Sequence, residues 1–242
     1  MERDSTLTLE GVQTAELHGN KMRLTLNTSR GDIPCVFHHC QGASGGVIWV
    51  CGALGGLDGP SFGIFSSLSG ELVDDDISSL RLHYRIPGNF DECVLDVLVG
   101  VHFLKRHNID RVVLAGHSFG GAVAIMAGTL SHDVNAVVGL SSQTFGAQDV
   151  AKLAPKPLLL IHGERDRNLP VKCSHQIYEW AKEPKELVIY HNSGHFLREC
   201  HRELHDLLKG WLVEKVGRGD NRVARGFSLA DEGDPKGWGY LN

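Results

Sequence analysis

The feature that most constrains the fold is an alternation between two kinds of apolar pattern along the chain. Short, continuous apolar runs occupy residues 46–53, 111–116 and 156–163, and each contains a glycine at or near its end. Such runs are typical of strands that are buried on both faces. Between them, apolar residues recur every three or four positions, as over residues 90–104, which predicts amphipathic helices. We therefore expect an α/β fold, with a mostly parallel central sheet and helices on both of its faces.

Asn89, with Glu92 three residues later, is expected to start the helix over residues 90–104 with a capping box. The last helix is expected to present one apolar stripe made of Phe196, Leu197, Cys200, Leu204, Leu207, Leu208 and Trp211.

The two ends of the chain follow different patterns. Residues 21–28 and 33–40 are expected to be extended, and the turn sequence SRGD joins them, which predicts antiparallel strands at the start of the sheet. Residues 217–242 are rich in glycine and charge and contain few core-forming side chains. We expect a single domain over residues 1–216, followed by a surface tail over residues 217–242.

Composition excludes several classes of partner. The 242 residues carry a formal net charge of −5, which offers no basic surface for nucleic acid or for an anionic membrane. No apolar run approaches the length of a membrane span, and the N-terminal residues lack the features of a secretory signal. The six cysteines are scattered without framework spacing, which favours reduced thiols in the cytoplasm or another reducing intracellular compartment.

One local cluster combines potential metal ligands. The segment CVFHHC contains Cys35, His38, His39 and Cys40. A zinc site usually needs a second pair of ligands at a defined spacing, and none follows here. The alternation of residue types favours a strand that presents different side chains to its two faces, so no metal site is expected.

The pattern G-x-S-x-G occurs three times, centred on Ser44, Ser61 and Ser118. A nucleophile elbow requires a buried strand directly before the serine and a helix directly after it. Ser44 lies between two predicted strands. Ser61 follows Pro60 without a preceding strand, so we interpret it as a helix N-cap. Only Ser118 has a predicted strand directly before it and a predicted helix directly after it. The same spacing also fits a serine that only caps the N-terminus of that helix.

A serine hydroxyl becomes a nucleophile only with a base, and the base needs an acid that orients it. Asp166 lies in the loop after one predicted strand, and His195 lies in the loop after the next. Both loops should open at the same sheet edge as Ser118, which is where ligands bind in open α/β sheets. Glu164 is the alternative acid. His191 is the nearest alternative base, but it is expected to belong to the strand end.

The segments GHSFGG, HGERDRNLP and NSGH, in this order and on these elements, resemble the motifs of the α/β-hydrolase superfamily. The resemblance extends over roughly residues 24–211. It implies that Ser118 is the nucleophile, Asp166 the acid and His195 the base of a catalytic triad.

The resemblance also implies two oxyanion donors. The backbone N–H of Phe119 would be the first, and Ala53 would supply the second, with Leu54 as the alternative. Family members often carry His-Gly in this loop, whereas this chain carries Cys51 and Gly52. The departure removes the usual histidine but keeps the glycines and the backbone donors.

The spacing of two predicted strands indicates a site without a cap domain. About a dozen residues separate a strand that ends near Ser142 from one that begins near Lys156, too few for a multi-helix cap. The chain therefore resembles compact members of dienelactone-hydrolase size, but with serine in place of their cysteine at the elbow. An apolar wall for an acyl group is expected from four residues: Leu54, Leu57, Phe62 and Phe145.

These features predict a serine hydrolase that cleaves a carboxylic ester or thioester through an acyl-enzyme intermediate. Its substrate would be a small-molecule ester or an acylated molecule, and the chemistry needs no metal or organic cofactor. Two alternatives stay open. One is a binding or scaffold protein on the same fold, with an idle or slow triad. The other is an acyltransferase whose acceptor is not water.

Overall fold

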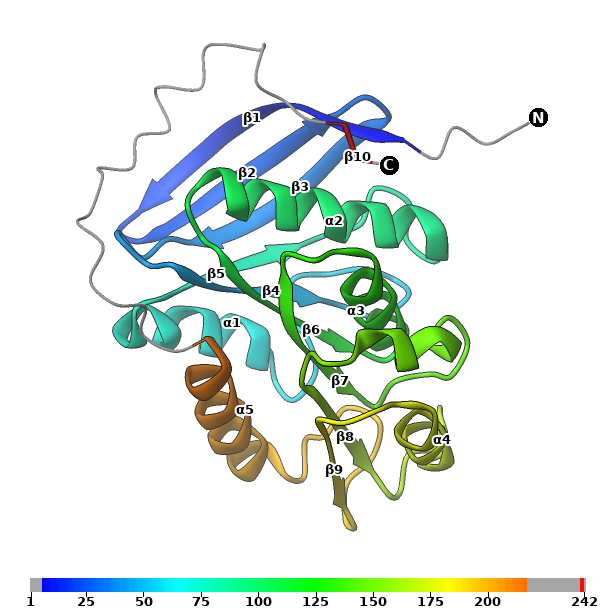
Figure 1. The fold of residues 1–242 in the computed structure, drawn as a ribbon. Helices are drawn as coiled ribbons and strands as arrows, with labels where there is room; N and C mark the ends of the chain where they lie inside the picture. The colour runs from blue at the N-terminus through cyan, green and yellow to red at the C-terminus, as the bar shows by residue number, and fades with distance from the viewer. Residues whose placement is uncertain (1–5, 217–239, 242) are drawn as a thin grey trace.

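The computed structural model describes residues 6–216 and 240–241, and it contains one ten-stranded mixed sheet (Figure 1). The order of the strands across it is β10-β1-β2-β3-β5-β4-β6-β7-β8-β9. The strands are β1 Leu7–His18, β2 Lys21–Thr28, β3 Gly31–His38, β4 Gly45–Val50, β5 Ile77–Leu82, β6 Arg111–His117, β7 Val134–Leu140, β8 Leu158–Gly163, β9 Lys185–Tyr190 and β10 Tyr240–Leu241.

Strands β4 to β9 are parallel to one another. Strands β1, β2 and β3 pair antiparallel, and β3 also pairs antiparallel with β5, where the parallel part of the sheet begins. This confirms the expected α/β sheet with an antiparallel start. Strand β1 was not expected. Its pairing with β2 contains register shifts between Leu9 and Gly11 and between Thr14 and Glu16, so the alternation of apolar and polar residues holds only over its first four residues.

Helices cover both faces of the sheet. They are α1 Ile64–Glu71, α2 Phe90–Arg106, α3 Phe119–Leu130, α4 Lys172–Trp180 and α5 His201–Val216, with 3-10 helices at Leu72–Asp75 and Gln148–Leu153. Helices α1 and α5 pack on one face around Trp49 and Phe65, whose rings lie 4.8 Å apart. Helices α2, α3 and α4 cover the other face (Figure 1). Burial of these apolar faces is the main source of stability for such a sheet.

Helix α2 begins as the sequence predicts. Asn89 is its N-cap, and its side chain accepts a hydrogen bond from the N–H of Glu92 at 3.3 Å. The reciprocal half of the expected capping box is missing because the Glu92 carboxylate pairs with Arg85 and Arg30 instead, at 2.7 and 2.9 Å.

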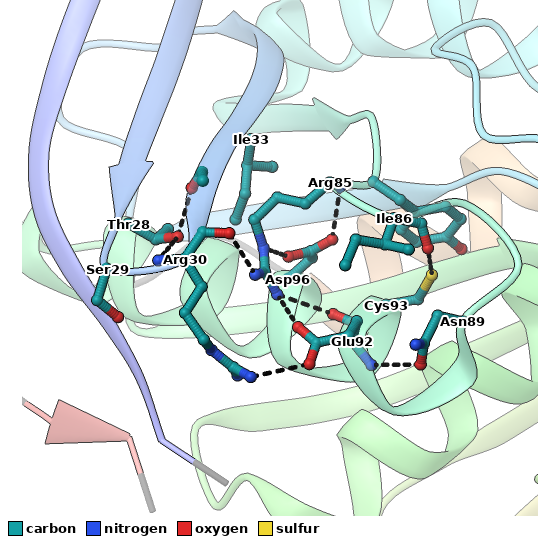
Figure 2. A network of polar contacts seen from close by, with 12 residues as sticks. Thr28, Ser29, Arg30, Ile33, Arg85, Ile86, Asn89, Glu92, Cys93 and Asp96 are labelled. Atoms are coloured by element: carbon teal, nitrogen blue, oxygen red, sulfur yellow. Dashed lines mark hydrogen bonds and ion pairs between the residues drawn. The ribbon is translucent and has the colours of Figure 1, made fainter. Parts of the chain in front are cut away.

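Those ion pairs belong to a buried network between α2 and the turn that joins β2 to β3 (Figure 2). The Arg85 guanidinium donates to Asp96, and the Arg85 N–H donates to the other oxygen of Asp96 at 2.8 Å. Asp96 is fully buried, so its charge requires this pairing. The network fixes the antiparallel start of the sheet against the helix that precedes β6.

Two helix starts differ from the sequence expectation. Ser61 is not an N-cap, because α1 begins after Gly63, and residues 61, 62 and 63 all have a positive φ. The last helix was expected to include Phe196, Leu197 and Cys200 in its apolar stripe, but α5 starts only at His201. Leu197 has a φ of 53°, which no α-helix accommodates, so these three residues form a loop instead.

Residues 141–157, between β7 and β8, contain a single 3-10 helix and no inserted cap domain. The expected surface tail lies outside the described residues apart from β10, which pairs with β1. Among the residues that the structure describes, no helix has the length and apolar character to cross a bilayer. Over the same residues, no three His, Cys, Asp or Glu side chains are grouped so that they could hold a metal ion.

Candidate active site

Ser118 occupies the sharp turn between β6 and α3. Its backbone has φ 60° and ψ −120°, a conformation that non-glycine residues rarely adopt, and its N–H donates to the Leu140 carbonyl at 2.8 Å. The turn leaves Ser118 partly exposed at the carboxyl edge of the sheet, directly before the N-terminus of α3. This is the strand, turn and helix arrangement that a nucleophile elbow requires.

The two glycines of the motif are required by close backbone contacts. A Cβ on Gly116 would lie 2.0 Å from the carbonyl oxygen of Gly120. A Cβ on Gly120 would lie 2.1 Å from the carbonyl oxygen of Cys51, which follows β4. Neither position therefore has room for a side chain, and the tight turn depends on both glycines.

Asp166 lies in the loop after β8 and is held by four hydrogen bonds. Its Oδ1 accepts the backbone N–H groups of Asn168 and Leu169, each at 2.8 Å. Its Oδ2 contacts Nδ1 of His195 at 2.6 Å and Nε2 of His162 at 3.1 Å. Burial alone would raise the pKa of Asp166, but the donors from Leu169, His195 and Asn168 outweigh it and hold that pKa below its ordinary value. Asp166 is therefore a buried, ionised carboxylate.

His195 lies in the loop between β9 and α5, and its side chain is 9% exposed. Its backbone carbonyl contacts Nε2 of His117 at 3.0 Å, and the two imidazole rings are 4.8 Å apart. His117 directly precedes Ser118, so this contact joins the histidine loop to the elbow. Burial lowers the pKa of His117 to about 4, which makes it a neutral packing residue at ordinary pH.

The alternative acid and base pair with each other, away from this cluster. Glu164 is exposed, and its Oε2 lies 3.2 Å from Nδ1 of His191, which is exposed as well. The structure thus brings Asp166 and His195 together beside the elbow and leaves Glu164 and His191 outside.

The loop after β4 approaches Ser118 from the other side. A Cβ on Gly52 would lie 3.8 Å from the Cβ of Ser118. A turn closed by the Gly55 N–H and the Gly52 carbonyl, at 2.9 Å, places Ala53 and Leu54 at its two central positions. Cys51 is buried, burial raises the pKa of its thiol to about 11, and its carbonyl accepts the Tyr84 hydroxyl at 2.8 Å. Cys51 is therefore an inert packing residue beside the elbow.

The residues expected to form an apolar wall are dispersed. Leu54 is 92% exposed, and Leu57 is partly buried. The exposed ring of Phe145 contacts Phe90, whereas that of Phe62 contacts His201 on α5. The exposed rings of Phe62 and Phe145 therefore pack against different elements.

The residue that sequence reasoning missed at this site is His162, at the end of β8. It is fully buried; Nδ1 lies 2.7 Å from the Ser174 hydroxyl, and Nε2 contacts both Asp166 and the Leu169 carbonyl at 3.1 Å. Burial lowers the pKa of His162, so it is neutral. The only signal in the sequence is its position four residues before Asp166.

Comparison with known proteins agrees with the geometry. A family model described as Phospholipase/Carboxylesterase matches residues 91–210. The uncharacterized protein YfhR of Escherichia coli O157:H7 is 31% identical over an alignment of 117 residues, and the match covers 37% of this chain and 41% of that protein. The match thus spans only about two fifths of the length of this curated relative.

Among solved structures, a dienelactone hydrolase from Anabaena variabilis superposes with a TM-score of 0.69 at 16% identity, covering 85% of this chain and 99% of that one. An alpha-beta serine hydrolase homologue from Coxiella burnetii superposes with a TM-score of 0.68 at 20% identity, covering 82% and 100%. Together with the order of the strands in the sheet, these superpositions show that the chain has the α/β-hydrolase fold.

Proposed function

We propose that this protein is a serine hydrolase that cleaves carboxylic esters or thioesters, with Ser118, His195 and Asp166 as its triad. The family match indicates an esterase-type hydrolase. The observation that carries the finer assignment is the 2.6 Å hydrogen bond between Nδ1 of His195 and the buried carboxylate of Asp166, beside the strained turn of Ser118.

The geometry of His195 sets the direction of proton transfer. Because Nδ1 keeps its proton and donates a hydrogen bond to the ionised Asp166, Nε2 is the nitrogen of the neutral imidazole that carries no proton. Nε2 can then accept the proton of the Ser118 hydroxyl as its Oγ attacks the carbonyl carbon of the ester. Asp166 stabilises the imidazolium that forms and does not itself take up the proton.

The tetrahedral intermediate carries its negative charge on the former carbonyl oxygen. The N–H of Phe119 belongs to the first turn of α3, where N–H groups have no partner within the helix, and it supplies one donor. The N–H of Ala53 supplies the other, from the turn that follows Gly52. The imidazolium then protonates the leaving oxygen or sulfur, and water releases the acyl group from Ser118 by the reverse sequence.

Labelling with a fluorophosphonate, followed by mass spectrometry, tests the nucleophile. Wild-type protein should be modified on Ser118, and Ser118→Ala should not react. Ser44→Ala is the matched control, because Ser44 has the same motif without the elbow, and it should be labelled like wild type. Labelling of folded Ser118→Ala would refute the assignment.

Hydrolysis and acyl-transfer assays, together with this labelling, distinguish the two alternative functions. Folded wild-type protein that neither reacts with the probe nor hydrolyses 4-nitrophenyl acetate would favour a binding or scaffold role. Transfer of the acetyl group to an added alcohol or amine, faster than its release to water, would favour an acyltransferase.

A further inference from the structure

A cavity of about 260 Å³ opens beside His195, between the loop that carries Asp166 and the loop that carries His195. The two loops are joined by a hydrogen bond from the Arg165 N–H to the Ser193 carbonyl, at 2.9 Å. The residues of the lining that matter here are Arg165, Arg167, His195, Phe196, Arg198 and Glu199.

The lining is strongly basic in a protein whose net charge is −5. Three arginines line the cavity, together with a single acidic residue, Glu199. Glu199 is already engaged, because its Oε2 accepts the Ser193 hydroxyl at 2.9 Å and the Gly194 N–H at 3.1 Å. Its charge also interacts with the guanidinium of Arg198, which helps to lower the pKa of Glu199.

In the part of the chain that the structure describes, no salt bridge joins Arg165, Arg167 or Arg198 to a carboxylate. The guanidinium of Arg198 lies over the rings of Phe62 and Phe196, at 5.7 and 5.3 Å from their centroids. Stacking of this kind holds a guanidinium in place while its N–H edge stays available to an anion.

In the proposed mechanism the leaving group departs next to His195, which lines this cavity. Its lining includes His195, the residue that protonates the leaving atom in the proposed mechanism, but neither Ser118 nor Phe119. The part of the substrate that enters this cavity is therefore the alcohol or thiol portion, not the acyl portion.

We propose that the preferred substrates are esters or thioesters whose leaving group carries an anion, a carboxylate or a phosphate, which Arg165, Arg167 and Arg198 bind. This inference rests on the proposed function, because it uses the role of His195 to orient the substrate. Arginine forms paired hydrogen bonds with both kinds of anion, so the chemistry of recognition is shared.

A matched pair of esters tests the proposal. The neutral member is 4-nitrophenyl acetate, and the anionic member is 3-carboxy-4-nitrophenyl acetate, which bears a carboxylate on the leaving group. The kcat/KM for each ester is divided by the rate constant of its hydroxide-catalysed hydrolysis, which corrects for the difference in intrinsic reactivity between the two esters. The corrected kcat/KM should favour the anionic ester by about tenfold or more, mainly through KM. The preference should fall as salt rises from about 20 mM to about 0.5 M, because the cavity is open to screening.

Variants assign the preference to the cavity. The double variant Arg165→Gln/Arg198→Gln should remove most of the preference and leave only the part that Arg167 supplies. Arg198→Lys should retain more of it, because the charge remains. Arg202→Gln is the control, since Arg202 is exposed in the first turn of α5, four residues after Arg198, and does not line the cavity. It should leave the ratio unchanged. Competition by inorganic phosphate against the neutral ester, set against competition by benzoate, distinguishes a phosphate site from a carboxylate site.

The outcomes separate this inference from the proposed function. If both esters are hydrolysed but the corrected ratio is near one, or if the double variant keeps the wild-type ratio, the arginine assignment is wrong and the hydrolase stands. If neither ester is hydrolysed by folded protein, the proposed function and this inference fall together.

Discussion

Nε2 of His162 lies 3.1 Å from Oδ2 of Asp166, the same oxygen that accepts Nδ1 of His195 at 2.6 Å. One carboxylate oxygen therefore serves two histidines, of which one is fully buried and neutral. Asp166 receives donors on both of its oxygens, and its orientation toward His195 depends on all of them. His162 is thus a positioning residue that acts through Asp166.

His162→Phe should lower kcat for 4-nitrophenyl acetate by about tenfold, the effect of about 1.4 kcal/mol in the barrier, with little change in KM. Loss of one donor should also raise the pKa of Asp166, so the acid limb of the kcat/KM profile should move to higher pH. His175→Phe, an exposed position on α4, is the control. If kcat falls but the pH profile does not move, His162 packs at the site and does not position Asp166.

The identity of the acid can be tested between two carboxylates that lie two residues apart. Asp166→Asn should lower kcat by about 10⁴-fold, because the amide cannot stabilise the imidazolium or hold the required tautomer of His195. Glu164→Gln should change kcat by less than about twofold, because Glu164 is exposed and contacts His191. Steady-state kinetics on both variants measures this. Equal losses in the two, or a larger loss in Glu164→Gln, would reverse the assignment.

Much of the fold could be predicted because local patterns and tertiary structure agree. The bounds of β2 coincide with the predicted extended segment, and Asn89 starts α2 as expected. Strand β1 could not be recognised, because its register shifts break the alternation of inward and outward side chains. The late start of α5 depends on the positive φ of Leu197, which a helical apolar pattern does not reveal.

The site was only partly predictable for a related reason. Ser118, Asp166 and His195 each follow a recognisable strand, so their common sheet edge could be inferred from chain order. The role of His162 depends on which carboxylate oxygen its ring reaches, and the arginine cavity depends on Arg198 meeting Arg165 and Arg167 across two loops. Neither the contact of His162 with Asp166 nor the grouping of the three arginines produces a periodic pattern in the sequence.

The glycines of the elbow can be tested against a glycine elsewhere. Gly116→Ala should lower the free energy of unfolding by more than about 2 kcal/mol, because its Cβ would lie 2.0 Å from a backbone oxygen. Gly210→Ala, within α5 and with no atom within 4 Å of the added Cβ, should instead raise it by about 0.5–1 kcal/mol. Chemical denaturation followed by circular dichroism measures both. Stability unchanged in Gly116→Ala would contradict the tight elbow.

His38 gives the protein a pH-dependent stability that is independent of the site. It is buried on β3, and its Nε2 lies 3.4 Å from the guanidinium of Arg81. Burial, with the positive charges of Arg81 and Lys21, lowers the pKa of His38 from 6.5 to about 4. At pH 7 the imidazole is neutral in both the folded and the unfolded chain. Between pH 6.5 and pH 4 the unfolded chain takes up a proton that the folded chain does not, so stability falls as the pH falls.

Comparison with His38→Gln isolates this contribution, because the amide does not titrate. Urea denaturation at pH 7 and at pH 4.5 should show that wild-type protein loses about 2 kcal/mol more than the variant over this interval. Gln can still accept a hydrogen bond from Arg81, so the variant should fold at pH 7. His132→Gln, a solvent-exposed position just after α3, should lose the same stability as wild type. Parallel losses in wild type and His38→Gln would mean that the buried imidazole takes up its proton in the folded state at an ordinary pKa.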